Sequence, residues 1–417
     1  MTKVVFHLGD KKTGSTAIQT TLASKSWTCG SVTLLYPGKD RISHIALAKG
    51  LLNKGATEMA ASRFDEVANE IRAIKPDVAV ISAEDFEDVS PDALKDAVLK
   101  HMPEFADEAR YIAYVRPHVD RVASSYAERV KASGFKGSMD DLYAKFKEKG
   151  TLAYAPRFLK WRDAFGDAFV LRPMIRDRLY KSDVVLDFLQ FSLGTDDFTA
   201  EIPPNANESV SLENLAVLNE MQIALKPDDG LRSDLAPAFC RYIARHMNQS
   251  TDIKGTKVQF HRSLAEKLVV ECAPDAMALD AAFFTGTPML DALNAAPAKA
   301  VEQPQSVRIE DHFSAREQFL IRLWAEQTRS FVKADPLGWA SMLRDEQREW
   351  VTGTIGGKPG AGKDGGTPAV ANGPGAGGRR AGKMGGGKGG QRKGPGRGAR
   401  PGGAGRGKGP KAPQTEA

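Results

Sequence analysis

The sequence predicts an α/β protein with a mostly parallel sheet, helices on both faces, a helical C-terminal part and a disordered basic tail. Over residues 1–200, short apolar runs alternate with amphipathic segments, the pattern of parallel strands joined by helices. Over residues 201–352 the strand-like runs fade and apolar residues keep helical spacing. Residues 353–417 are mainly Gly, Pro, Lys and Arg. We therefore expect an α/β core, a helical appendage of the same body, and a tail with these boundaries.

The strand-like runs of the core are short, rich in β-branched or aromatic residues, and bounded by polar or turn residues. They are Lys3–Leu8, Val32–Tyr36, Val78–Ser82, Tyr111–Val115 and Phe169–Leu171. Amphipathic segments, which predict helices, lie near residues 41–53, 58–74, 91–101, 117–133, 138–149 and 154–165. In the appendage, the sequence Ser314–Glu317 predicts a capping box that begins another helix.

The formal net charge of +6 divides unevenly along the chain. Residues 353–417 contain 13 Lys or Arg, 2 Asp or Glu and 25 of the 40 glycines, whereas residues 1–352 carry a net charge of −5. Such a tail lacks the apolar residues needed to offset the entropy of ordering its backbone. Basic Gly-rich segments bind polyanions weakly, so contact with nucleic acid or another polyanion is one expectation for the tail; a neutral, solubilising extension is the other.

Composition also argues against several classes of protein. The chain has no apolar run of about 18 residues, so we expect no membrane span. Its three cysteines, Cys29, Cys240 and Cys272, are far apart and suggest neither a disulfide framework nor a zinc site. A reduced, cytoplasmic protein without a bound metal is the expectation.

The clearest chemical signal is the segment VVFHLGDKKTGST at residues 4–16. A strand-like run leads into a Gly-rich turn, and a helix-like segment follows Gly14. Such a turn directs backbone N–H groups and a helix N-terminus at a single point, which suits a phosphate. A Walker A loop reads GxxxxGK[ST], but Ser15 stands here at its lysine position, and the basic residue is Lys12, before the second glycine.

A second signal is RYIAYVRPHVDRVASSYAERVK at residues 110–131. It predicts a strand ending at Arg116 and a helix that carries Ser124 two turns farther on. Ligands of open α/β sheets bind beyond the carboxyl ends of the strands. An arginine and a hydroxyl there would suit a second phosphate.

Together the two segments resemble the sulfotransferase family. KTGST at 12–16 is similar to the family's 5′-phosphosulfate loop, and RPHVDRVASSY at 116–126 is similar to its 3′-phosphate segment, although Pro117 comes one place early. SAEDF at 82–86 is a further likeness. The resemblance covers roughly residues 3–195 and favours the bacterial members that modify carbohydrates or other small hydroxyl acceptors.

The resemblance implies a donor, 3′-phosphoadenosine 5′-phosphosulfate, and a role for each motif residue. Lys12 would stabilise the leaving phosphate. The other donor-binding residues would be Lys11, Thr13, Gly14, Ser15, Thr16, Arg116 and Ser124. An acceptor hydroxyl also needs a base. Glu84 follows a strand that should end at the same edge of the sheet, and His44 begins a predicted helix. The sequence does not choose between these two.

The sequence leaves two other functions open. An atypical P-loop kinase would need a lysine at the position of Ser15 and a carboxylate for magnesium. A non-catalytic polyanion- or RNA-binding protein would rely on the basic tail, without a recognisable RNA-binding motif in the body. The acceptor and the oligomeric state do not follow from the sequence.

Overall fold

The computed structural model describes residues 2–38, 42–53, 57–202, 210–227, 231–247 and 255–352. The predicted basic tail, residues 353–417, lies outside the described residues. Its expected disorder and its expected contact with polyanions therefore stay predictions. Among the described residues, no helix combines the length and the apolar character that crossing a membrane requires.

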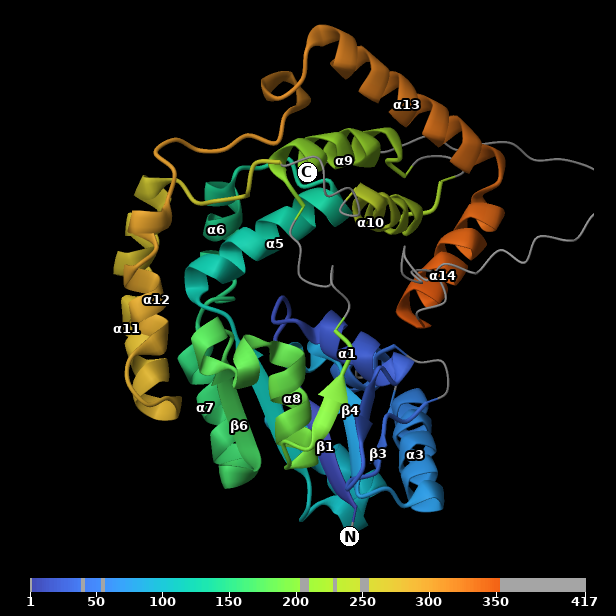
Figure 1. Cartoon of the computed structure of the whole chain (residues 1–417), viewed down its shortest axis with the longest axis vertical. Helices are drawn as coiled ribbons and strands as arrows, with labels where there is room; N and C mark the ends of the chain where they lie inside the picture. Colours follow the sequence, from blue (N-terminus) through green and yellow to red (C-terminus); the bar gives the residue numbers. More distant parts are fainter. Residues whose placement is uncertain are drawn as a thin grey trace, which may run out of the picture. The chain divides into compact units, whose positions relative to one another are not determined.

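The main sheet has five strands, all parallel, which confirms the predicted fold class (Figure 1). They are Lys3–His7 (β1), Leu34–Leu35 (β3), Val78–Ser82 (β4), Arg110–Val115 (β5) and Phe169–Pro173 (β6). In space the order is β3-β4-β1-β5-β6, so β1 is central and pairs with both β4 and β5. Along the chain, β3 and β4 come first and lie on one side of β1, and β5 and β6 follow on its other side. The end of β1 is therefore a switch point, where open α/β sheets bind ligands.

Helices cover both faces of this sheet. They are Ser15–Ser24 (α1), Ile45–Leu52 (α2), Thr57–Ile74 (α3), Pro91–His101 (α4), Tyr154–Phe165 (α7) and Val184–Leu193 (α8). Two further helices, His118–Ser133 (α5) and Met139–Glu148 (α6), pack against each other beyond the sheet (Figure 1). Short 3-10 turns lie at Glu84–Asp88 (η1), Pro103–Phe105 (η2), Gly166–Ala168 (η3), Arg176–Arg178 (η4) and Tyr180–Ser182 (η5). Neighbouring residues of a strand point to opposite faces. Val4 and Phe6 accordingly pack with α3, α4 and α7, whereas Val5 packs with α1 and α8.

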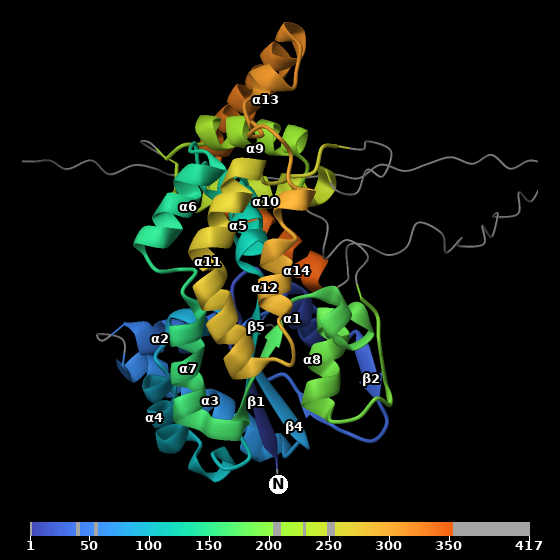
Figure 2. The same ribbon diagram turned by 90° about the vertical axis from the view of Figure 1, so that its left-hand side faces the viewer.

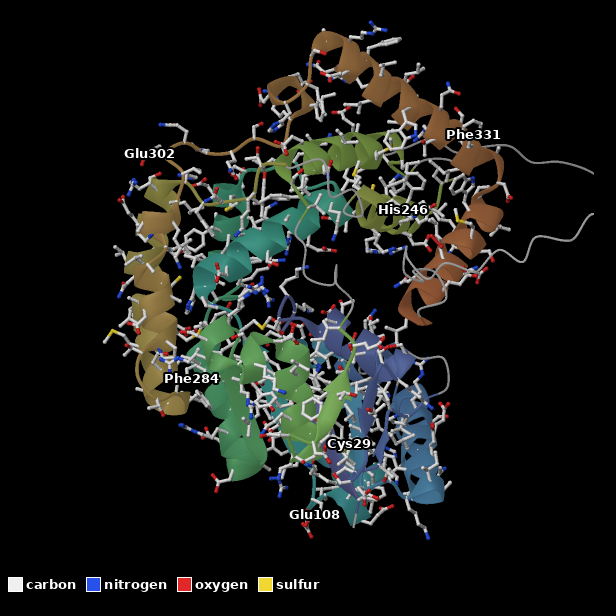
Figure 3. The ribbon with its side chains drawn as sticks, viewed as in Figure 1. Cys29, Glu108, His246, Phe284, Glu302 and Phe331 are labelled. Carbon is white, nitrogen blue, oxygen red and sulfur yellow. The ribbon has the colours of Figure 1, made fainter. Side chains whose placement is uncertain are left out.

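The region after residue 200 is helical, as predicted (Figure 2). Its helices are Leu212–Ala224 (α9), Leu235–Met247 (α10), Arg262–Phe283 (α11), Pro288–Asn294 (α12), Ala315–Ala334 (α13) and Pro336–Thr352 (α14), with 3-10 turns at Pro297–Lys299 (η6) and Ile309–Asp311 (η7). The predicted capping box is present, with Ser314 and Glu317 each bonding the other's backbone N–H. Packing joins α9 and α10 to α5, and α11 to α7. His246 of α10, labelled in Figure 3, lies 3.9 Å from Glu346 of α14.

Sequence reasoning missed a two-stranded antiparallel sheet, Trp27–Cys29 (β2) and Phe198–Ala200 (β7). The hydroxyls of Thr28 and Thr199 lie 2.7 Å apart across it. Three-residue strands carry almost no periodic signal, and their pairing joins segments 171 residues apart. The predicted strand Val32–Tyr36 is also shorter than expected, with only Leu34–Leu35 in the ladder.

Candidate functional site

The loop after β1 is fixed to the neighbouring strand β5. The N–H of Leu8 donates to the Ile112 carbonyl at 2.8 Å. The Gly9 carbonyl accepts from the Tyr114 N–H at 2.7 Å, and the Asp10 N–H donates to the Tyr114 carbonyl at 3.0 Å. The backbone thus follows β5 for three residues beyond β1 and then turns into α1. These bonds hold the Gly-rich turn at the carboxyl edge of the sheet, where the sequence predicted it.

Asp10 organises the turn from within. Its carboxylate is 1% exposed and makes a bidentate pair with Arg157 of α7, at 2.7 and 2.5 Å. Its carbonyl accepts the hydroxyls of Thr13 at 2.6 Å and Ser15 at 3.2 Å. Those two hydroxyl protons are therefore used inside the loop. Contact of Thr13 and Ser15 with a donor stays a prediction, and these bonds leave their backbone N–H groups to make it. The hydroxyl of exposed Thr16 has no hydrogen bond to another described residue.

Gly14 places the backbone N–H groups of the turn. Its φ of +87° lies in the left-handed region, and a Cβ would meet a methyl group of Val184 at 2.7 Å, so only glycine fits. Helix α1 begins at the next residue without a side-chain cap. Within the described part of the chain, the N–H groups of residues 12–16 donate to no acceptor. These donors at a helix N-terminus form a cradle that suits an anion.

The two lysines of the loop point to different partners. The Lys12 Nζ lies 3.3 Å from a carboxylate oxygen of Glu128, on α5. Burial lowers the pKa of Lys12, against the opposing charge of Glu128. The Lys11 ammonium instead pairs with Asp88 of η1. Although burial acts to lower the pKa of Lys11, its hydrogen bond to Asp88 raises it. The predicted contact of Lys11 with a donor stays a prediction. Because the Lys11 ammonium is paired with Asp88, the structure does not favour that contact.

Arg116 occupies the predicted place at the end of β5. Its side chain is half-buried, and burial lowers its pKa. Within the described residues, its guanidinium has no hydrogen bond or ion pair, although Asp120 and Arg121 act on it electrostatically. Pro117 is the N-cap of α5 rather than its first helical residue. Ser124 is half-buried on α5, and its hydroxyl likewise bonds to no described residue. An anion would supply the partner that this arginine lacks.

Arg121 is the residue of the second motif that sequence reasoning left without a role. It is 4% exposed and donates to the Lys11 carbonyl, and it also bonds the Glu87 carboxylate at 2.9 and 3.2 Å. Arg121 therefore ties α5 and η1 to the loop. Sequence reasoning also missed Arg157 and Glu128. Glu128 could have been noticed, because it lies one helical turn after Ser124; nothing local marks Arg157.

The two candidate bases have different surroundings. Glu84 is half-buried at the start of η1, where a Cβ on Gly9 would lie 3.2 Å from its backbone. Burial, and then the charge of Asp85, raises the pKa of Glu84, against the charges of Lys12 and Lys11. The backbone of Glu84 thus lies beside the loop after β1, and the charges of both lysines act on its carboxylate.

His44 is held by the backbone on both sides of its ring. It is 1% exposed, its Nδ1 accepts the Ser82 N–H at 3.1 Å, and its Nε2 lies 2.8 Å from the Pro37 carbonyl. With Nδ1 as acceptor, Nε2 carries the proton and donates it. Neither nitrogen is available to take a proton from an acceptor in this arrangement. These contacts favour His44 as a base less than they favour Glu84, and the role of either residue stays a prediction.

Comparison with known proteins adds one likeness. No protein-family model and no curated protein matches the chain. Among solved structures, the chain is similar to the crystal structure of a sulfotransferase from Alicyclobacillus acidocaldarius. The TM-score is 0.38 and the sequence identity 16%, over 68% of this chain and 97% of that chain. A likeness of this degree assigns no activity to this chain.

Proposed function

We propose that the protein is a sulfotransferase that moves a sulfuryl group from 3′-phosphoadenosine 5′-phosphosulfate to a hydroxyl of a carbohydrate or other small acceptor. The observation that carries the proposal is a pair of unsatisfied anion sites at the ends of adjacent strands. After β1 there are free backbone N–H groups and Lys12, and after β5 there is Arg116, which has no partner among the described residues. A nucleotide with separate 5′ and 3′ phosphates has two anionic groups to match them.

The residues present fit such a donor. The N–H groups of residues 12–16 would bind the 5′-phosphosulfate, and Arg116 with Ser124 would bind the 3′ phosphate. Ser15 stands where a Walker loop has its lysine, and its 3%-exposed side chain bonds the Asp10 carbonyl. It supplies no charge for a triphosphate, so the loop fits the P-loop kinase alternative less well. A requirement for a metal, or for none, stays a prediction.

The reaction requires the protein to align acceptor and donor, to stabilise the charge on the leaving oxygen and to supply a base. The acceptor oxygen attacks sulfur, the bond between sulfur and the bridging oxygen of the 5′ phosphate breaks, and the 3′,5′-bisphosphate leaves. The leaving oxygen gains negative charge, which the partly buried Lys12 ammonium would stabilise. The acceptor's hydroxyl proton would pass to the Glu84 carboxylate. The reaction thus uses one cation and one carboxylate beside the same loop.

Direct binding tests the proposal. Isothermal calorimetry on the full chain should give a micromolar dissociation constant for adenosine 3′,5′-bisphosphate, which corresponds to about −8 kcal/mol. AMP, which lacks the 3′ phosphate, should bind more weakly. Equal affinity for the two nucleotides would contradict the assignment of Arg116. Transfer of radiolabelled sulfate from the donor to extracts of the source cell would then identify the acceptor.

The role of Glu84 leads to a prediction about pH. A base acts only when it has lost its proton, and burial raises the pKa of Glu84 above its ordinary value. We therefore expect kcat/KM to rise as pH increases through that raised pKa and to level off above it. Glu84→Gln should remove this limb of the pH profile and lower kcat. His44→Gln serves as the comparison, because a structural histidine can be replaced at a cost in stability while the limb remains. If His44→Gln removes the rising limb of the pH profile and Glu84→Gln keeps it, His44 is the base and Glu84 is not.

A further inference from the structure

Glu128 contacts the lysine on which the proposed reaction depends. Its Oε2 lies 3.3 Å from the Lys12 Nζ and 2.6 Å from the Lys131 Nζ, so one carboxylate oxygen joins two ammonium groups. Lys12 comes from the loop after β1, whereas the other two residues come from α5. The contact therefore crosses from one anion-binding element to the other.

The ion pair is only partly protected from solvent. Lys12 and Glu128 are each about a third exposed, at 32% and 31%. At that exposure an ion pair has modest strength, and a stronger anion can displace its carboxylate. A phosphosulfate bound at the N-terminus of α1 is such an anion, because it lies on the same loop as Lys12 and carries more charge than a carboxylate.

In the absence of a ligand, a carboxylate beside Lys12 opposes the effects that lower the pKa of its ammonium group. Burial lowers the pKa of Lys12, and Lys131 lowers it further, while Glu128 and Glu84 act to raise it. Burial would raise the pKa of Glu128, but the charges of Lys12 and Lys131 outweigh burial and lower it to about 2. At neutral pH the carboxylate is thus ionised and favours the charged form of Lys12.

We propose that Glu128 is a positioning residue, which holds the Lys12 ammonium against α5 while the donor is absent and releases it to the 5′-phosphosulfate when the donor binds. Lys131 makes this release possible. When Lys12 leaves, Glu128 keeps a second cation at 2.6 Å and is not left as an unpaired, partly buried charge. The proposal rests on the proposed function of the site.

One consequence is that donor and Glu128 compete for the same ammonium. Glu128→Gln removes the competitor and a negative charge, so adenosine 3′,5′-bisphosphate should bind about fivefold more tightly, the factor expected for a partly exposed ion pair. Glu128→Asp keeps the charge with a shorter reach and should give an intermediate affinity. Lys131→Met should have the opposite effect and weaken binding, because Glu128 then has only Lys12 as a partner.

A double-mutant cycle separates this coupling from plain charge effects. In the Glu128→Gln background, Lys131→Met should lower the affinity for the bisphosphate less than it does in the wild type, because the carboxylate that pairs with Lys131 is absent. Glu148→Gln, a matched change of charge at an exposed residue of α6, should leave the affinity unchanged.

A second readout needs no nucleotide. The rate at which acetic anhydride acylates Lys12, followed by mass spectrometry at pH 8, reports how much of its amine is neutral. The rate should increase in Glu128→Gln and stay at the wild-type value in Glu148→Gln. An unchanged rate in Glu128→Gln overturns the inference, whatever the protein binds.

Calorimetry distinguishes the two proposals. Tighter binding by Glu128→Gln supports the inference. If the wild type binds the bisphosphate and Glu128→Gln binds it equally or more weakly, the inference is overturned and the proposed function stands. If the wild type binds no bisphosphate, the proposed function fails, and the release of Lys12 to a donor fails with it.

Discussion

Lys12→Ala should lower kcat by about 10² to 10³, because the variant loses a cation whose charge matters most as the leaving phosphate gains negative charge. The dissociation constant of the bisphosphate should change much less, because the backbone N–H groups of residues 12–16 still bind its 5′ phosphate. Single-turnover sulfate transfer, measured beside calorimetry on the same variant, separates the two quantities.

The neighbouring lysine provides the comparison for this prediction. Lys11→Ala removes the same charge one residue earlier, but the Lys11 ammonium is engaged with Asp88. Its effect on kcat should therefore be much smaller. Equal losses of turnover in the two variants would mean that the net charge of the loop, and not the position of Lys12, determines the rate.

Arg116→Ala should weaken binding of adenosine 3′,5′-bisphosphate by about 10- to 100-fold, because hydrogen bonds to a charged group contribute roughly 1.5–3 kcal/mol. The affinity for AMP should stay nearly constant, since AMP has no 3′ phosphate. In kinetics, the donor's KM should rise more than kcat falls. Isothermal calorimetry with the two nucleotides measures the contrast directly.

The other end of the same strand offers a matched control. Arg110 begins β5 and donates to the carbonyls of Asp107 and Ala109, at the edge of the sheet opposite the site. Arg110→Ala changes the net charge equally and should leave both nucleotide affinities unchanged. If Arg116→Ala weakens the binding of both nucleotides to a similar degree, Arg116 supports the loop and does not bind the 3′ phosphate.

The local order of the chain around the site could be predicted from the sequence. β4 lies at the predicted residues, β5 begins one residue early, and α1 begins directly after Gly14. These features depend on the alternation of apolar residues and on glycines in turns, which are properties of a few consecutive residues. The same signals were enough to place Lys12 in the turn after β1 and Arg116 directly after β5.

Tertiary structure alone decided what these residues contact. Asp10 pairs with Arg157 across 147 residues, and Lys12 with Glu128 across 116. The fold also placed the Ser82 N–H and the Pro37 carbonyl against the two ring nitrogens of His44, which the sequence could not indicate. Such partners are chosen by strand order and helix packing, which bring distant segments together, and no local periodicity encodes them. The sequence by itself thus determined where the loop and its charges lie along the chain, and the fold determined which of those charges are already paired and which are left for a ligand.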